Sequence, residues 1–286
     1  MNEYKILTDS TSDLPLEILK KFDIEAIPFT YQFGDGEVFV DKIDEEREKR
    51  MRTFYTRIKN GEMPTTSQIN PGEFRDFFEP ILAKNKDILF ISFSSGLSSS
   101  YNSAQMAAKQ LMEEYPDTKI NVIDSLCASL GEGLLVYEAA LLKEKWMNID
   151  SLTNWIKENR LKVQHPNIIG SLKHLKRGGR ISSTQAFFGS LLNVMPILHM
   201  NSEGKLEIVE QKRGMKSAIE FVLQEMRKDN AGKRIFISHS DCKNKAFEVA
   251  DMMKKEFDAE ILVNEIGPTI GTHTGCGTIA LFYMKK

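Results

Sequence analysis

The chain has 286 residues, of which 41% are hydrophobic and 27% charged, so it is an ordinary globular protein with room for one or two domains. A formal net charge of −2 provides no basic field for nucleic acid, and no apolar run approaches the roughly 20 residues that span a bilayer. Three widely separated cysteines argue against a disulfide framework and predict a reducing, cytoplasmic setting.

Strands and helices alternate through the first half of the chain. Apolar runs predict strands at residues 4–8, 26–30, 88–93 and 120–124, and Pro28 assigns the second of these to a sheet edge. The segments between and after them predict helices at residues 12–22, 44–60, 72–83, 99–114, 128–145 and 150–159, with Asp150 as the cap of the last one. Such alternation predicts a parallel sheet with right-handed crossovers.

The pattern changes after about residue 160, where Gln164-His165-Pro166 interrupts it. A turn at residues 201–204 predicts a hairpin between strands at 196–200 and 206–210. Further strands are expected at 167–171, 234–238 and 261–265, with helices at 215–228 and 244–257. We therefore predict two α/β domains, residues 1–162 with a parallel sheet and residues 163–286 with a mixed sheet.

Several predicted loops are rich in small hydroxyl residues. They include Asp9-Ser10-Thr11-Ser12-Asp13, Ser94-Ser95-Gly96-Leu97-Ser98 and Pro64-Thr65-Thr66-Ser67-Gln68. Helix capping is the simplest explanation for any one of them. Several such loops beyond the carboxyl edge of one sheet favour a shared polar pocket.

Residues 267–277 form a glycine-rich segment with Thr269, Thr272, His273 and Thr274. We expect a loop that presents His273 on an exposed bend, with its donors suited to a small anionic or carbonyl head group. A structural histidine is the competing interpretation. No two histidines have metal-ligand spacing, so we expect no metal.

The basic segment 173–180 ends in Gly178-Gly179-Arg180, a turn on which Arg180 could pair with a carboxylate or phosphate; a solvated charge run is the alternative. The apolar residues 186–198 are expected to be core for the most part, and some could line a pocket for an acyl chain. There is no P-loop and no Gly-x-Ser-x-Gly, and residues 275–280 lie too near the end of the sequence to be a dinucleotide fingerprint.

These motifs together resemble the DegV family, whose characterised members bind fatty acids. The resemblance runs from end to end, through Asp9 to Pro15, Thr66-Ser67-Gln68, Ser94 to Ser98, Leu175 to Ser182 and Gly267 to Gly275. Departures are Ser99-Ser100, where a Gly-Thr pair is common, and Cys276, where proline is frequent.

The resemblance implies that a long-chain fatty acid lies between the two domains, with no cofactor. Its carboxylate would contact Thr66, Ser67, Ser95 or Ser98, and His273. Arg180 would lie near the head group or on a surface that faces a partner. The resemblance further implies delivery of the lipid to a separate fatty acid kinase that forms an acyl phosphate for phospholipid synthesis, and it allows transient contact with a membrane.

Two other functions compete with a non-enzymatic carrier. One is an enzyme for a small acyl or phosphorylated substrate, with Ser95 or Ser98 as nucleophile and His273 as base. The other is a sugar or phosphate sensor, which predicts a polar pocket. The apolar residues Phe187, Phe188, Leu191, Leu192 and Ile197 argue against a sensor if they line the cleft.

Overall fold

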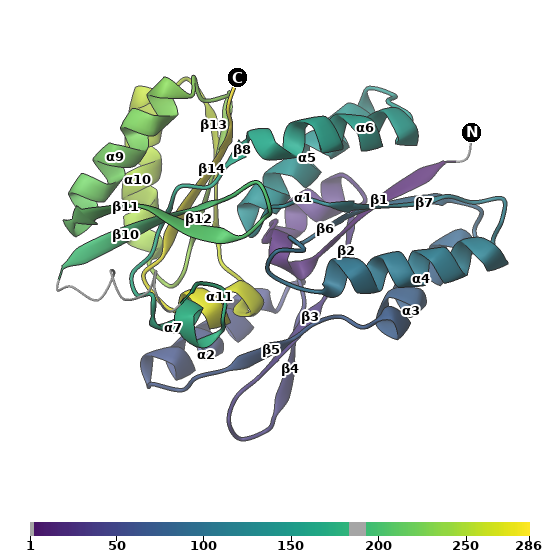
Figure 1. Ribbon diagram of the computed structural model, residues 1–286, viewed down its shortest axis with the longest axis horizontal. Helices are drawn as coiled ribbons and strands as arrows, with labels where there is room; N and C mark the ends of the chain where they lie inside the picture. The colour runs from purple at the N-terminus through teal and green to yellow at the C-terminus, as the bar shows by residue number, and fades with distance from the viewer. Residues whose placement is uncertain (1–2, 183–192) are drawn as a thin grey trace.

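The computed structural model describes residues 3–182 and 193–286, which are built around three β-sheets (Figure 1). Sheet A is parallel and has the strand order β2-β1-β6-β7. Its strands are β1 (Tyr4–Asp9), β2 (Glu25–Ile27), β6 (Asp87–Ser92) and β7 (Ile120–Asp124). Every residue of β6 is buried, as its continuous apolar run predicted.

Helices cover both faces of sheet A. Leu7, Ile88 and Phe90 pack against the helices on one face, and Ile6, Leu89 and Ile91 pack against those on the other. The first face carries α3 (Pro71–Leu82) and α4 (Ser100–Glu114), and the second carries α1 (Leu16–Lys21), α5 (Leu130–Glu144) and α6 (Ile149–Asn159).

Sheet C is mixed, with the order β11-β10-β9-β14-β12-β13 and β8 paired to β14. Its strands are β8 (Val163–Gln164), β9 (Asn167–Ile168), β10 (Val194–Met200), β11 (Leu206–Arg213), β12 (Arg234–His239), β13 (Glu260–Glu265) and β14 (Ile279–Met284). One face packs on α9 (Gly214–Lys228) and α10 (Lys243–Glu256), and the other meets α5, which lies between sheets A and C. The predicted α/β class, parallel in the first half and mixed in the second, is confirmed.

Sheet B is antiparallel and was not predicted. It has the order β4-β3-β5 and consists of β3 (Phe29–Gln32), β4 (Val38–Asp41) and β5 (Thr65–Ser67). The single strand predicted at 26–30 is in fact divided at Pro28, because proline has no N–H for a ladder and redirects the chain. Only β2 forms the predicted edge of sheet A, whereas β3 is central in sheet B, which packs on α2 (Arg47–Lys59).

Short elements complete the described chain, and some local predictions need correction. The short elements are the 3-10 helices η1 (Ser10–Ser12) and η2 (Arg160–Lys162) and the helices α7 (Lys173–Arg177) and α11 (Pro268–Thr274). The cap of α6 is Asn148, whose side chain accepts from the Ser151 N–H at 2.9 Å, and the predicted cap Asp150 lies inside the first turn. An acid in that turn interacts favourably with the helix dipole, which explains why its sequence signal resembles that of a cap.

The predicted hairpin is present and connects the two main sheets. Gly204 takes a left-handed conformation (φ 71°) in the turn between β10 and β11. The hydroxyl of Ser94, in the loop after β6, donates to the Gly204 carbonyl at 2.7 Å.

The strands of sheet A precede the predicted boundary at residues 162–163 and those of sheet C follow it. The division into two domains stays a prediction.

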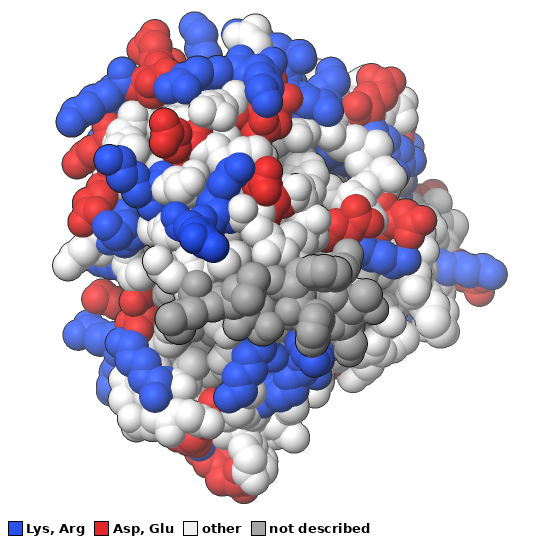
Figure 2. Space-filling model, turned by 60° about the vertical axis from the view of Figure 1, so that its left-hand side comes forward, with Lys and Arg blue, Asp and Glu red and all other residues white. Residues whose placement is uncertain are grey.

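The surface carries charges of both signs. On the face drawn in Figure 2, lysine and arginine side chains alternate with aspartate and glutamate over the upper part. This mixture matches the formal net charge of −2. Among the described residues, no helix is both long enough and apolar enough to cross a membrane.

Gly133 of α5 allows this helix to approach the chain after β1, and we predict that Gly133→Ala destabilises the protein. A β-carbon there would lie 2.5 Å from the Ser12 backbone oxygen. In a free helix the change would stabilise by up to about 1 kcal/mol, but overpacking should reverse the sign and cost roughly 1–3 kcal/mol. Urea unfolding measures the difference. Gly34→Ala is the control, because nothing lies within 4 Å of that position. A stabilised Gly133→Ala protein would contradict the prediction.

Candidate functional site

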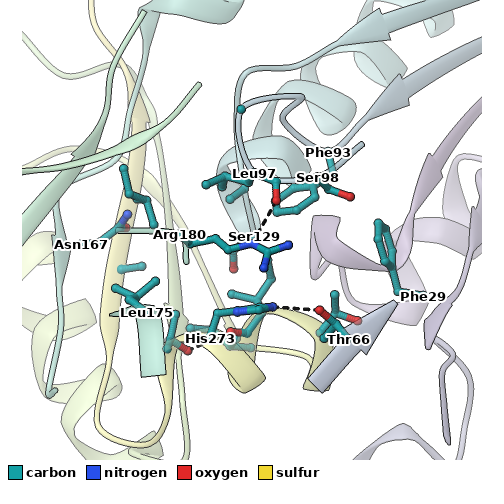
Figure 3. Close-up of a pocket in the computed structure, with 18 of the residues that line it drawn as sticks. Phe29, Thr66, Phe93, Leu97, Ser98, Ser129, Asn167, Leu175, Arg180 and His273 are labelled. Carbon is teal, nitrogen blue, oxygen red and sulfur yellow. Dashed lines mark hydrogen bonds between the residues drawn. The ribbon is translucent and has the colours of Figure 1, made fainter. Parts of the chain in front are cut away.

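A cavity of about 490 Å³ lies between the carboxyl edge of sheet A and one face of sheet C (Figure 3). Its walls come from β5, the loop after β6, the entry to α5, strands β9 and β14, and α11. Opposed residues of an antiparallel pair share a face, so the pairing of Asn167 with Ala280 brings both to the cavity wall. The volume lies within the range of small-molecule sites.

Most predicted site residues line this one cavity. Thr66, Ser67, Ser95, Ser98, Arg180 and His273 all do so, although they come from four separate segments. Thr272 does not, and its buried hydroxyl donates to the Pro268 carbonyl at 2.8 Å within α11. The structure therefore assigns Thr272 to its own helix rather than to the cavity.

Two segments predicted as loops are regular elements. Residues 268–274 form α11, so His273 projects from a helix and is largely buried rather than exposed on a bend. Pro268 at the start and Gly275 (φ 67°) just after the end are ordinary boundary signals of a helix. The glycine and threonines between them are poor helix formers, which favoured a loop in the sequence. Thr66 and Ser67 lie on β5, paired with Tyr31 and Thr30 of β3.

His273 and Thr66 form the central polar pair. His273 Nε2 lies 2.9 Å from Thr66 Oγ1, and His273 Nδ1 is buried without a partner (Figure 3). The tautomer protonated at Nε2 fits this environment best, because a buried N–H without an acceptor would cost more than a lone pair. His273 would then donate to Thr66, which leaves the Thr66 hydroxyl hydrogen free for a ligand oxygen.

Gly178 makes room for the imidazole. A β-carbon at this position would lie 2.2 Å from His273 Nδ1. The backbone of Gly178 is helical (φ −72°), so contact with the ring, and not conformation, requires glycine here. Gly179 (φ 70°) then turns the chain toward Arg180, as the two glycines predicted.

Arg180 brings an unneutralised charge to the polar end. Its Nε donates to the Leu97 carbonyl at 3.1 Å, and Nη1 donates to the Gly178 carbonyl. Within the described ranges it forms no ion pair with a carboxylate, and burial lowers its pKa. A half-buried guanidinium without a counter-ion in the described part of the chain favours an anionic ligand.

The electrostatics of His273 follow from the same neighbours. Burial, and then the positive charges of Arg180, Arg177 and His174, lower the pKa of His273 to about 3. The imidazole is therefore neutral near pH 7 and acts as a hydrogen-bonding group. The same positive potential favours the ionised form of a bound carboxylic acid.

Ser95 and Ser98 lie in the loop after β6, as predicted. The backbone N–H of Ser95 donates to Asp124 Oδ1 at 3.1 Å, which anchors the loop to the end of β7. Ser98 Oγ accepts from the Ser100 N–H at 3.2 Å and lies 3.1 Å from Ser100 Oγ. Neither serine hydroxyl contacts His273, whose recorded partner is Thr66.

The remaining wall is mainly apolar. Phe29, Phe93, Ile270 and Phe282 contribute, together with Leu97, Ile169, Leu175, Leu206, Ile266 and Ala280. Of the residues considered for an acyl pocket, 186–192 lie outside the described ranges, and Ile197 packs in the core under α9 and α10. In the described residues, the apolar wall comes partly from predicted strands, with Phe29 and Phe93, and partly from segments predicted as loops, with Leu97, Leu175 and Ile270.

Sequence reasoning also missed polar residues of the site. Ser129 Oγ donates to Asp13 Oδ2 at 2.6 Å and lies 2.8 Å from Ser238 Oγ. Gln68 lines the cavity beside Ser67, and its place in the Thr-Ser-Gln motif was an available signal. Asn167 had none, because only the strand order brings it to the cavity. Within residues 3–182 and 193–286, no cluster of His, Cys, Asp or Glu is arranged to hold a metal.

Fold and cavity together define a class of protein. A mostly apolar cavity that also holds hydroxyls, a neutral imidazole and a guanidinium without an ion pair among the described residues is suited to an amphiphile with an anionic head. The family model described as uncharacterised proteins of the DegV family matches residues 3–286, so the chain belongs to the DegV family. The resemblance noted in the sequence is confirmed.

Relatives match along nearly the whole chain. A DegV domain-containing protein of Clostridium perfringens is 40% identical over 288 residues, which cover 99% of this chain and 98% of that one. A crystal structure described as DegV, a fatty acid binding protein from Bacillus subtilis, is 29% identical with a TM-score of 0.86 over 100% of both chains. The Streptococcus pneumoniae fatty acid kinase B3 protein, loaded with linoleic acid, is 24% identical with a TM-score of 0.85, covers 99% and 100% of the two chains, and shows likeness of fold.

We predict that His273 stays neutral in the ligand-free protein from pH 8 down to pH 5. Its folded pKa of about 3 lies below the unfolded value near 6.5. The unfolded state therefore binds more protons, and the stability contribution present above pH 6.5 is lost as the pH falls. This loss is on the order of 2 kcal/mol between pH 7 and 5.

NMR titration of the imidazole and urea midpoints at both pH values test this prediction. His273→Gln should lose correspondingly less stability on acidification than the unsubstituted protein. An imidazole that titrates near pH 6 would contradict the prediction.

Proposed function

We propose that the protein binds a long-chain fatty acid in this cavity and presents its carboxylate to a partner fatty acid kinase, which forms an acyl phosphate. The observation that carries the proposal is one cavity that combines a guanidinium, a neutral imidazole and several hydroxyls with a mainly apolar wall. Carried to this chain, the fatty acids described in the solved DegV structures are ligands of the matching shape and charge.

The two parts of the cavity would act differently. Each methylene buried contributes about 0.8 kcal/mol, so the acyl chain supplies most of the gross binding energy, offset by the costs of association. Thr66, Ser67 and Ser98, with Arg180, would orient the carboxylate and replace its water. His273 would contact the carboxylate directly and would also orient the Thr66 hydroxyl toward it.

Delivery to a kinase requires a head group near the surface. Arg180 lines both the cavity and an open hollow that it shares with Gly179 and Lys205. A carboxylate held by Arg180 would therefore lie near solvent, within reach of a docked enzyme. Transient contact with a membrane and a cytoplasmic location belong to the same proposal, because a carrier must collect its lipid and meet its kinase.

The geometry favours a carrier over a Ser/His-dependent enzyme. His273 contacts a threonine, its Nδ1 is not oriented by an acid, and a pKa of about 3 makes it a poor base near pH 7. The apolar wall also argues against a sugar sensor.

Mass spectrometry of the ligand released by denaturation tests the proposal. We expect a near-stoichiometric fatty acid, whose length and unsaturation would report the preference of the cavity. A protein that is purified empty and takes up no added fatty acid would refute the carrier function. Turnover of acyl esters that disappears in His273→Ala would then favour the enzyme.

We also predict that Thr66→Ala weakens fatty acid binding about tenfold without unfolding the protein, since a hydrogen bond to a charged group contributes roughly 1.5–3 kcal/mol. Fluorescent fatty acid displacement measures the affinity. The control is Thr56→Ala on α2, outside the cavity. Equal affinities of Thr66→Ala and Thr56→Ala would exclude Thr66 from the head-group site.

A further inference from the structure

The helix that carries His273 is held at its start by two buried carboxylates from distant parts of the chain. Asp13 Oδ1 accepts from the Gly267 N–H at 2.7 Å. Asp41 Oδ2 accepts from both the N–H and the hydroxyl of Thr269, at 3.0 and 2.7 Å. Both acids are almost fully buried, so water does not compete for these bonds.

Asp41 belongs to the sheet that carries the partner of His273. Asp41 on β4 pairs with Phe29 of β3, and β3 pairs on its other side with β5, where Thr66 lies opposite Tyr31. Asp41 therefore joins sheet B, which positions Thr66, to α11, which positions His273. The 2.9 Å contact between the two side chains joins the same two elements.

The surroundings leave α11 little freedom to compensate. A β-carbon at Gly267 would lie 2.6 Å from Arg47 Nη2, 2.9 Å from Asp13 Oδ1 and 3.1 Å from Asp41 Oδ2. Further along, a β-carbon at Gly271 would lie 2.8 Å from the Phe54 and Tyr55 side chains. The start of α11 therefore packs against charged side chains, and one side of it packs against aromatic rings. A shift of α11 along its axis would break the hydrogen bonds to Asp13 and Asp41.

We propose that Asp41 is a positioning residue for carboxylate recognition, which it controls by fixing α11 against sheet B without lining the cavity itself. The inference rests on the proposed function, and it names a residue that sets the preference of the cavity for an acid head group. Most of the apolar wall, which would hold the acyl chain, lies outside α11, so loss of Asp41 should affect the head group more than the tail.

The test compares a fatty acid with the fatty alcohol of equal length. In Asp41→Ala, we expect the preference for the acid to fall at least about tenfold, the effect of one lost hydrogen bond to a charged group, with little change for the alcohol. Asp41→Asn keeps an oxygen acceptor for Thr269 and should retain most of the preference. Asp35→Ala is the matched control, because Asp35 lies in the same sheet B hairpin and pairs with Arg57 of α2.

A second variant covers the case in which Asp41→Ala does not fold. Thr269→Val removes one of the two donors to Asp41, and Thr269→Ser keeps it. We expect Thr269→Val to lose preference for the acid and Thr269→Ser to keep it. The proposal is overturned if Asp41→Ala folds and its preference for the acid is unchanged. If Asp41→Ala does not fold, an unchanged preference in Thr269→Val overturns it.

The imidazole resonances of His273 in ligand-free protein give a readout that does not depend on lipid. They should shift in Asp41→Ala and stay unchanged in Asp35→Ala. If the unsubstituted protein binds no fatty acid, the proposed function fails, and this shift still decides whether Asp41 positions His273.

Discussion

The buried carboxylate of Asp13 is the contact on which the arrangement of the chain depends most. Its Oδ1 accepts from Arg47 and from the Gly267 N–H, and its Oδ2 accepts from Ser129. The backbone oxygen of Asp13 accepts from the side chain of Asn264. These partners come from α2, the entry to α11, the entry to α5 and β13. A buried charge is tolerated only when such a set of partners is complete, so each of these segments is constrained by the others.

Charge is distributed unevenly around α11. Asp9, Asp13, Asp41 and Glu132 are buried behind its start with Arg47. Burial raises the pKa of Asp9 and Asp13 to about 6 and that of Glu132 well above its usual range, so the cluster retains protons that a solvated group would lose. The other end of α11 meets Arg177 and Arg180, which makes the surroundings of the head group positive.

How far the sequence predicts the structure depends on the range of the interactions. Continuous apolar runs such as that of β6 are local signals, and they predicted most of the strands of sheet A. Sheet B was missed because its strands are short, β3 pairs with β5 across the whole of α2, and the sheet also packs on α11, which is far away in the sequence. Thr66, Ser67, Ser95, Ser98, Arg180 and His273 were found through motifs, whereas Asn167 and Asp41 depend on strand pairing that no local pattern encodes. Thr272 was included as one of the hydroxyl donors of residues 267–277, but its hydroxyl donates within α11.

Helix α5 belongs to the hydrophobic cores of both sheets. Leu134, Leu135 and Tyr137 share one cluster with Ile6 and Leu89 of sheet A and with Phe236, Ala280 and Phe282 of sheet C. Separating the halves would expose an apolar side of this helix to water, at a cost proportional to the area uncovered. Large hinge motions between the sheets are therefore disfavoured, and the two halves should melt in a single cooperative transition. The same shared core therefore disfavours entry of a ligand by separation of the two halves.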